Sequence, residues 1–236
     1  GLMCARSNSL RGIVNGIDYD VFNPETDPFI TQNYNARNCR KEKIKNKLQL
    51  QKDLGLEVDP KVMMIGIVSR LTDQKGFDLI AYVMDEMCQD AVQFVILGTG
   101  DERYENMFRH FDWKYHGKVS AQIYYDEPMS HRIYAASDAF LMPSLFEGLP
   151  VVGIEAQASG LPCVFSDTIT DEIILSDRAV RLSLEQSDEA WAKELIRLGT
   201  ADRDRAEERS VVRSAGYDIV EETKRLQEIY VSLIEK

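Results

Sequence analysis

Several features that define common protein classes are missing from this sequence of 236 residues. Its cysteines form no CxxC pair and no Cys/His pair with metal-ligand spacing; they are Cys4, Cys39, Cys88 and Cys163. Basic residues are outnumbered, since 28 Lys and Arg against 39 Asp and Glu give a formal net charge of -11. That is the wrong sign for binding a nucleic-acid backbone. We therefore expect no metal centre and no nucleic-acid partner, and widely spaced cysteines favour a reducing cytoplasm.

Long apolar runs are missing as well. The longest nearly uncharged stretch, residues 139–165, is interrupted by Glu147, Glu155 and several prolines, so it cannot form a membrane span of about 20 apolar residues. No basic segment followed by an apolar one opens the chain, which gives no indication of a signal peptide. We expect a cytoplasmic protein without a membrane span, and the opening GLMCARSNSL is interpreted as the edge of a fragment.

Short apolar runs alternate with longer amphipathic segments, which is typical of a parallel sheet covered by helices. The spacing of apolar residues predicts helices over about 76–88 and 216–235, and we expect the apolar stripe of the second to belong to the core. The predicted fold is a single Rossmann-like, doubly wound α/β domain over residues 1–236, with irregular chain before about residue 40. The expected strands are 62–68, 93–97, 119–124, 139–142 and 162–165, with weaker signals at 12–14 and 180–184.

Two segments are unusually charged. Residues 36–52 are rich in Lys and Arg, with a thin apolar seam at Ile44 and Leu48. A solvated helix face is the preferred interpretation, and a patch for an anionic partner is the alternative. Residues 202–209 alternate in charge sign and predict an exposed helix with weak ion pairs.

The segment SRLTDQKG, residues 69–76, directly follows an apolar strand and opens a helix. Its two cations therefore lie at the carboxyl edge of the sheet, where doubly wound sheets bind ligands. Arg70 offers a planar fork and Lys75 a point charge, a combination that matches a diphosphate better than a single carboxylate. Two surface cations near a helix start are the alternative interpretation.

A second candidate segment, residues 143–155, follows another short apolar strand. Gly148 is expected to permit a turn that other residues resist, and Pro150 suits the start of the next helix. Amide groups at that helix start can face phosphate or sugar oxygens. Glu147 in the turn and Glu155 one turn into the helix can approach one ligand from different heights, and a hydroxyl-rich ligand supplies the partners that such glutamates need.

Other enzyme classes share parts of this pattern. Two glutamates also occur in glycosidases, but hydrolysis of a neutral glycoside needs no pair of cations beside them. The segment LGTGD at 97–101 provides a glycine turn at Gly98 after the next strand. It lacks the third glycine and the acidic residue of a dinucleotide motif, so it indicates only a nucleotide lying across the sheet edge.

Three pieces of the chain resemble the C-terminal, nucleotide-sugar half of bacterial glycogen synthases and plant starch synthases. They are residues 15–24, 69–78 and 125–144, so this resemblance covers roughly residues 1–144. From Leu145 onward, LFEGLPVVGIEAQASGLPCVFSDTITDE resembles retaining glycosyltransferases that build exopolysaccharide, capsule and glycolipid sugars. The proline-cysteine-glycine turn and twin-glycine loop of glycogen synthases are absent. The chain thus resembles two related families joined near residue 144, as a divergent natural protein or a spliced one.

The resemblance implies a role for each matching residue. Arg70 and Lys75 would hold the donor diphosphate and stabilise charge on the departing nucleoside diphosphate. Glu147 would approach the transferred sugar, and Glu155 would bind the ribose hydroxyls. The amides of Gly148 and Leu149 would face the sugar or the distal phosphate, and Tyr125 would pack beside the base, with a core or rim tyrosine as the alternative. Gly98 is expected to lie against the nucleotide because of its place after the next strand, not because of the resemblance. His131 and Arg132 match motif positions to which we assign no role, and we expect both on a helix surface.

The function implied is that of the donor-binding half of a two-domain, GT-B type retaining glycosyltransferase. The first expectation is glucose transfer from ADP-glucose to an α-glucan. The alternatives are a polysaccharide or glycolipid transferase that uses a UDP-sugar, and a non-catalytic nucleotide-sugar-binding module or engineered chimera. The nucleotide sugar is a substrate, and no cofactor is expected. No counterpart of the acceptor-binding N-terminal domain is found, so we expect the chain alone to be inactive.

Overall fold

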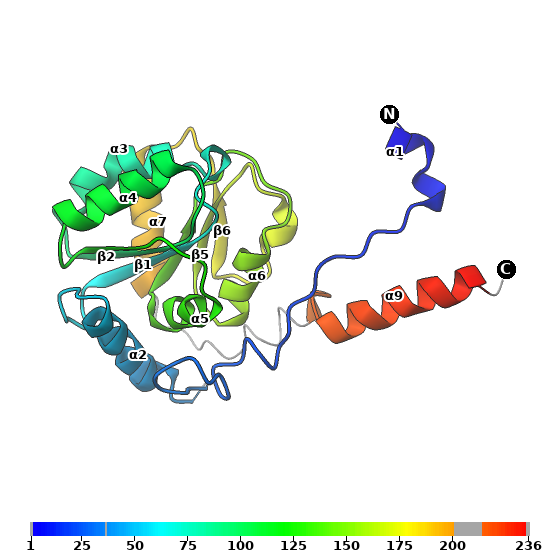
Figure 1. The fold of residues 1–236 in the computed structure, drawn as a ribbon, viewed down its shortest axis with the longest axis horizontal. Coiled ribbons are helices and arrows are strands. Elements are labelled where there is room, and N and C mark those ends of the chain that lie inside the picture. Colours follow the sequence, from blue (N-terminus) through cyan, green and yellow to red (C-terminus); the bar gives the residue numbers. More distant parts are fainter. Residues whose placement is uncertain (1, 36, 201–213, 235–236) are drawn as a thin grey trace.

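The computed structural model describes residues 2–35, 37–200 and 214–234 (Figure 1). Its centre is a six-stranded sheet in the order β3-β2-β1-β4-β5-β6, and every neighbouring pair of strands is parallel. This order reverses direction between β1 and β4, where a doubly wound sheet opens a crevice at its carboxyl edge. The strands are β1 Met63–Val68, β2 Val92–Leu97, β3 Val119–Gln122, β4 Ala139–Met142, β5 Cys163–Ser166 and β6 Ala179–Leu182.

Helices cover both faces of the sheet (Figure 1). On one face, α3, α4 and α7 pack on alternate strand residues such as Ile65 and Ile67. On the other, α2 and α5 pack on Met64 and Val95, and α6 packs beside β4 and β5. The helices are α1 Leu2–Ala5, α2 Cys39–Asp53, α3 Phe77–Met87, α4 Glu102–Lys114, α5 Glu127–Ala136, α6 Val151–Ala158, α7 Asp188–Thr200 and α9 Ile219–Ile234, with 3-10 turns at Ser7–Ser9, Asp73–Lys75 and Asp171–Ile173.

The Rossmann-like, doubly wound fold expected from the sequence is confirmed, and most strand positions agree closely. The weak strand signal at 12–14 was wrong, because these residues form no strand. The following segment forms only an isolated bridge, between Ile17 and Asp218, outside the six-stranded sheet. The strand expected over 119–124 ends at Gln122. Residues 202–209 lie outside the described part of the chain.

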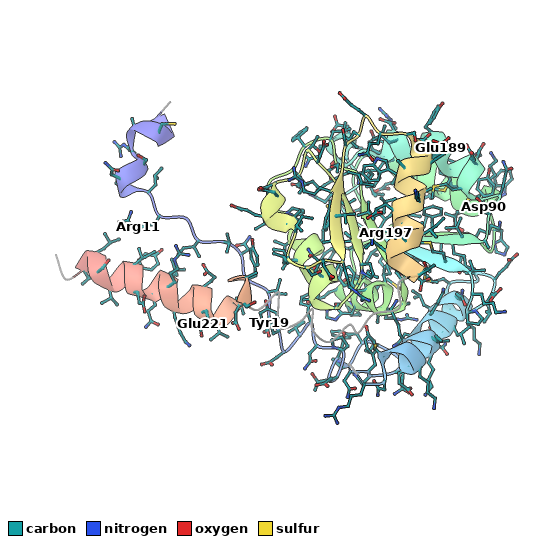
Figure 2. All side chains as sticks on the ribbon, turned by 180° about the vertical axis from the view of Figure 1, so that it is seen from behind. Arg11, Tyr19, Asp90, Glu189, Arg197 and Glu221 are labelled. Carbon is teal, nitrogen blue, oxygen red and sulfur yellow. The ribbon has the colours of Figure 1, made fainter. Side chains whose placement is uncertain are left out.

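The C-terminal helix α9 extends away from the sheet beside the N-terminal segment (Figures 1 and 2). None of its described residues is buried, and Tyr230 and Leu233 are 61% and 64% exposed. The expectation that its apolar stripe belongs to the core is therefore wrong. Periodicity identifies an amphipathic helix but not the surface that covers it.

The basic helix α2 also departs from the expectation of a solvated face. The Lys43 ammonium is buried and donates to the Ser137 carbonyl at the end of α5. Lys47 is buried too, and its Nζ lies 2.7 Å from Asp138 Oδ2. Ile44, expected in the apolar seam, is 43% exposed instead. Two of the six Lys and Arg residues of α2 therefore fasten this helix to the junction between α5 and β4, whereas Lys41, Lys45 and Lys52 are exposed, as a solvated face requires.

We expect the chain from Ile17 to Thr200 to unfold as one unit, across the family junction expected near residue 144. β4 lies before that junction and pairs in register with β5 after it, Leu141 opposite Val164. Splitting the chain there would expose both strand edges. Limited proteolysis under native conditions should therefore yield no pair of stable fragments divided near residue 144. Recovery of two such folded fragments would contradict a single domain.

Candidate functional site

Two loops meet at the carboxyl edge of the sheet, where β1 and β4 lie side by side. The loop after β1 carries Arg70 and Lys75, and the loop after β4 carries Glu147. The Leu145 amide donates to the Gln74 carbonyl at 2.7 Å, which joins the loops through their backbones. Segments separated by some seventy residues in the sequence thus form one site at the position where such sheets bind ligands.

Lys75 and Glu147 form an ion pair inside this junction. The Lys75 ammonium donates to Glu147 Oε2, and Gln74 Nε2 donates to the same oxygen at 3.4 Å. The pair is shielded from water, since the side chains of Lys75 and Glu147 are only 9% and 18% exposed. Glu147 also forms an isolated backbone bridge with Ile169. The glutamate is therefore held on both sides, unlike the free turn residue that its sequence suggests.

Arg70 lies at the same edge with a different character. Its side chain is exposed and forms no ion pair within the described parts of the chain. The planar guanidinium is thus free to make a bidentate contact with an incoming phosphate or carboxylate. The site therefore combines Arg70, which is exposed, with Lys75, whose charge is already paired with that of Glu147.

Close backbone approach builds the loops on either side of Arg70. Gly98 directly follows β2, and a Cβ there would overlap the Ser69 carbonyl oxygen. Gly76 adopts a left-handed conformation with φ of 72°, and a Cβ there would overlap the Pro143 carbonyl oxygen. Packing between loops therefore explains both glycines. The expected contact of Gly98 with a nucleotide stays a prediction.

Gly148 is different, and the expected steric reason for it was wrong. It is not among the glycines with positive φ, and a Cβ there would meet nothing within 4 Å. It is exposed, Leu149 is half-buried, and Pro150 forms the N-cap of α6 with φ of -76°. The backbone beside Glu147 is thus open to solvent at the N-terminal end of a helix, where amides favour anions.

Glu155 lies in the middle of α6 and points toward α5. The Tyr134 hydroxyl, fully buried on α5, donates to Glu155 Oε2 at 3.0 Å. Burial raises the pKa of Glu155 above its usual value, and the Tyr134 hydrogen bond only partly opposes this. Burial and then the neighbouring Glu155 raise the pKa of Tyr134 well above its usual range, so Tyr134 remains a donor. Glu155 is thus oriented by a neutral partner, and its other carboxyl oxygen accepts no hydrogen bond from residues 2–35, 37–200 or 214–234, so it can accept one from a hydroxyl ligand.

The raised pKa of Glu155 predicts a specific pH dependence. The native state holds its proton more tightly than the unfolded chain, whose Glu155 titrates near 4.5. This stabilisation is complete below that pH and is lost as the pH rises through the native pKa, with a slope of at most about 1.4 kcal/mol per unit. In urea unfolding at a series of pH values above 4.5, Glu155→Gln should remove this decline. An unchanged slope would contradict the shift, and Glu25→Gln, at an exposed site, is the control.

Sequence reasoning missed a buried pair between Asp27 and His131, which lies on α5. Asp27 Oδ2 lies 2.7 Å from His131 Nδ1, and the Phe22 ring stacks on the imidazole with centroids 4.5 Å apart. The pair fastens the irregular N-terminal segment to α5, three residues before Tyr134. The expectation that His131 lies on a helix surface was wrong, because His131 is buried. Its partner could not be found because Asp27 lies in a segment without periodic pattern.

Tyr125 lies in the loop between β3 and α5 and is 87% exposed. This position agrees with a rim residue, and the contact with a base expected from the resemblance stays a prediction. Among the described residues, no group of three or more His, Cys, Asp or Glu side chains is arranged to hold a metal ion. No helix in the described ranges has the length and apolar character that crossing a bilayer requires.

Comparison with known proteins assigns this arrangement to a family. The model of the family described as "Glycosyl transferases group 1" matches residues 62–200, which include both loops. The chain is similar to the glycogen synthase of Lachnospira eligens, with 71% identity over 147 residues, 62% of this chain and 31% of that protein. The glycogen synthase of Clostridium acetobutylicum is 54% identical over the same length. The chain thus spans about a third of the curated relatives it matches.

Solved structures agree with the fold. The catalytic domain of starch synthase IV from Arabidopsis thaliana, bound to ADP and acarbose, superposes with a TM-score of 0.77 and 27% identity. The match covers 100% of this chain and 51% of that one. HepE from Anabaena, solved with UDP and glucose, has a TM-score of 0.68 at 16% identity, covering 94% of this chain and 57% of its own. Each of these neighbours therefore extends well beyond the part that this chain matches.

Proposed function

Because the chain belongs to the group 1 glycosyl transferases, we propose that it is the donor-binding half of a retaining glucosyltransferase that uses ADP-glucose to extend an α-glucan. The similarity to glycogen synthases and to a starch synthase solved with ADP supports this donor. The observation that carries the proposal is the meeting of Lys75 and Glu147 at the sheet edge. Lys75 provides the positive charge that a diphosphate needs, and Glu147 provides the hydrogen-bond acceptor that sugar hydroxyls need.

In this proposal the donor lies across the carboxyl edge with its diphosphate over the loop after β1. Arg70 and Lys75 bind the phosphates and stabilise the negative charge that develops on the leaving nucleoside diphosphate. Glu147 accepts hydrogen bonds from the transferred sugar, and the exposed amides of Gly148 and Leu149 face the sugar or the distal phosphate. Glu155, oriented by Tyr134, accepts from the ribose hydroxyls, and Tyr125 covers the base at the rim.

Transfer itself is proposed to need more protein than this chain. A glycosyl transfer requires the acceptor hydroxyl to be held in line while water is excluded. Arg70 at the carboxyl edge is exposed, and the starch synthase is about twice as long as the part that this chain matches. We propose that the α-glucan binds chiefly to that additional part, and that this chain alone binds the donor weakly without transferring glucose.

Calorimetric titration of the purified chain with ADP, ADP-glucose, UDP and UDP-glucose tests the donor site. ADP-glucose should bind in preference to UDP-glucose. Glu155→Ala should weaken ADP and ADP-glucose alike, by about tenfold for a lost hydrogen bond to a charged group. Glu147→Ala should weaken ADP-glucose without weakening ADP, because its proposed partner is the sugar.

Two outcomes would count against this assignment. Stronger binding of UDP-glucose would identify the chain with the UDP-sugar transferases instead. Equal losses from both variants for both ligands would refute the division of roles between Glu147 and Glu155. Glu25→Gln, in an exposed loop remote from the sheet edge, provides the control for nonspecific effects of charge.

A further inference from the structure

A groove of about 520 Å³ lies between α3 and α7, on the face of the sheet opposite α2 and α5. Figure 2 views the molecule from this side, with Glu189 and Arg197 on α7 and Asp90 after α3. Its floor and walls are apolar and include Ile80, Val83, Met87, Leu141, Trp191 and Leu195. Small-molecule sites usually have volumes of roughly 300 to 1,000 Å³ and such a lining. The proposed donor site does not use this groove.

The charges at the rim of the groove lie toward its two ends. Asp188 and Glu189 form the first turn of α7, and Glu86 and Asp90 lie at the end of α3. Each helix follows a strand of the same parallel sheet, so both begin at the carboxyl edge of the sheet and their first turns lie at that edge. The two acidic pairs are therefore separated along the groove, with apolar residues between them.

The length of α3 gives the scale of this separation. The helix from Leu79, beside the first turn, to Glu86 rises roughly 10 Å at 1.5 Å per residue. All four rim carboxylates belong to exposed residues, and Lys193 adds one ammonium to the lining. An occupant that complements this groove has an apolar middle and a positive charge at each end.

We propose that the groove binds a linear aliphatic diamine. Each ammonium lies at one acidic pair, where it stays in contact with water and loses little hydration. The methylene chain between them lies on the apolar floor and leaves water. With C–C bonds of about 1.5 Å, an extended chain of eight methylene groups holds two nitrogens roughly 11 Å apart, which matches this span. A polyamine with an internal ammonium fits less well, because that charge would lie on the floor without a partner.

The sequence provides a reporter for this site. Of the two tryptophans, Trp191 lines the groove, and Trp113 is 77% exposed on α4. In a Trp113→Phe background, the fluorescence of Trp191 alone reports on occupancy. Titration with octane-1,8-diamine should give a saturable change. Octan-1-amine, octane-1,8-diol and spermidine should each bind at least about tenfold more weakly. The first lacks one terminal ammonium, the second lacks both, and the third carries a charge in the middle of its chain.

Variants separate the proposed site from general attraction to an acidic protein. In the same background, Glu86→Gln with Asp90→Asn should weaken the diamine about tenfold. Asp20→Asn with Glu25→Gln removes the same charge from the exposed N-terminal segment and should leave affinity unchanged. Ala192→Phe should fill the groove and abolish the signal. Circular dichroism verifies that each variant folds. If Ala192→Phe does not fold, Glu86→Gln with Asp90→Asn still tests the site.

Three results would overturn the proposal. The first is the absence of a saturable Trp191 response to the diamine. The second is equal affinity for octane-1,8-diol, which would show that the rim charges are irrelevant. The third is equal weakening by the groove pair and the control pair, which would reduce the effect to net charge. None of these results bears on nucleotide-sugar binding, so the proposal stands or fails independently of the proposed function.

Discussion

Replacing Lys75 by alanine should lower the affinity of the chain for ADP-glucose by more than about 100-fold. A charged hydrogen bond to phosphate contributes roughly 1.5 to 3 kcal/mol. In addition, the variant leaves the Glu147 carboxylate unpaired at the edge where an anion must bind. Loss of an attraction and appearance of a repulsion act in the same direction, and about 1.4 kcal/mol corresponds to each tenfold change. Calorimetric titration with ADP and ADP-glucose measures the effect.

A double variant separates these two contributions. Adding Glu147→Gln to Lys75→Ala removes the repulsion, so ADP should recover about tenfold in affinity. Removing Lys75 alone leaves one partner of a shielded ion pair and should lower the free energy of unfolding. Glu147→Gln should restore part of that free energy, because it removes the charge that was left without a partner. Arg70→Ala, at an exposed residue, should weaken ADP binding without affecting unfolding. Unchanged ADP affinity in both Lys75→Ala and Arg70→Ala would refute the diphosphate site.

Replacing Gly76 by alanine should strongly destabilise the chain at this edge. Gly76 has a φ of 72°, which costs a residue with a Cβ about 1 to 2 kcal/mol. The new Cβ would also overlap the Pro143 carbonyl oxygen, so the loops after β1 and β4 would have to move apart. A total loss of about 3 kcal/mol or more is expected in urea unfolding at constant pH.

Gly148→Ala is the matched comparison, because the same methyl group is added to the neighbouring loop. Its Cβ meets nothing within 4 Å and its φ is not positive, so stability should change by less than about 0.5 kcal/mol. Donor affinity should nevertheless fall, since the methyl group would project into the space where the donor is proposed to lie. If Gly148→Ala destabilised the chain as much as Gly76→Ala, the backbone geometry of these loops would be wrong.

The sequence predicted the sheet well because each strand has a local signature. β4 coincides with the expected range, since Asp138 and Pro143 border a fully apolar run. Lys75 and Glu147 were both selected as site residues because each follows such a run. Their mutual contact could not be predicted, because it depends on β1 and β4 being neighbours in a sheet whose strand order is set by long-range packing.

Other misinterpretations share a different cause. The lysines of α2 were interpreted as solvated because charge is usually exposed, whereas Lys43 and Lys47 are buried against carbonyls and Asp138. Similarly, the stripe of α9 was assigned to the core from its spacing alone. In both cases the helix and the residues that share one of its faces were predicted correctly. What that face contacts, another part of the protein or solvent, was predicted wrongly. Spacing reports which residues share a face, and only tertiary structure determines what that face meets.

The ion pair at the sheet edge makes binding an exchange rather than a simple addition. Lys75 and Glu147 satisfy each other in this structure, and under the proposed function this contact would have to open before either side chain could bind the donor. A phosphate alone would take the lysine and leave the carboxylate without a partner; a free sugar would do the reverse. Only a molecule that carries both groups, joined at the right spacing, compensates both halves of the broken pair. Under the proposed function, the ion pair itself would therefore select against the separate phosphate and sugar fragments of a nucleotide sugar.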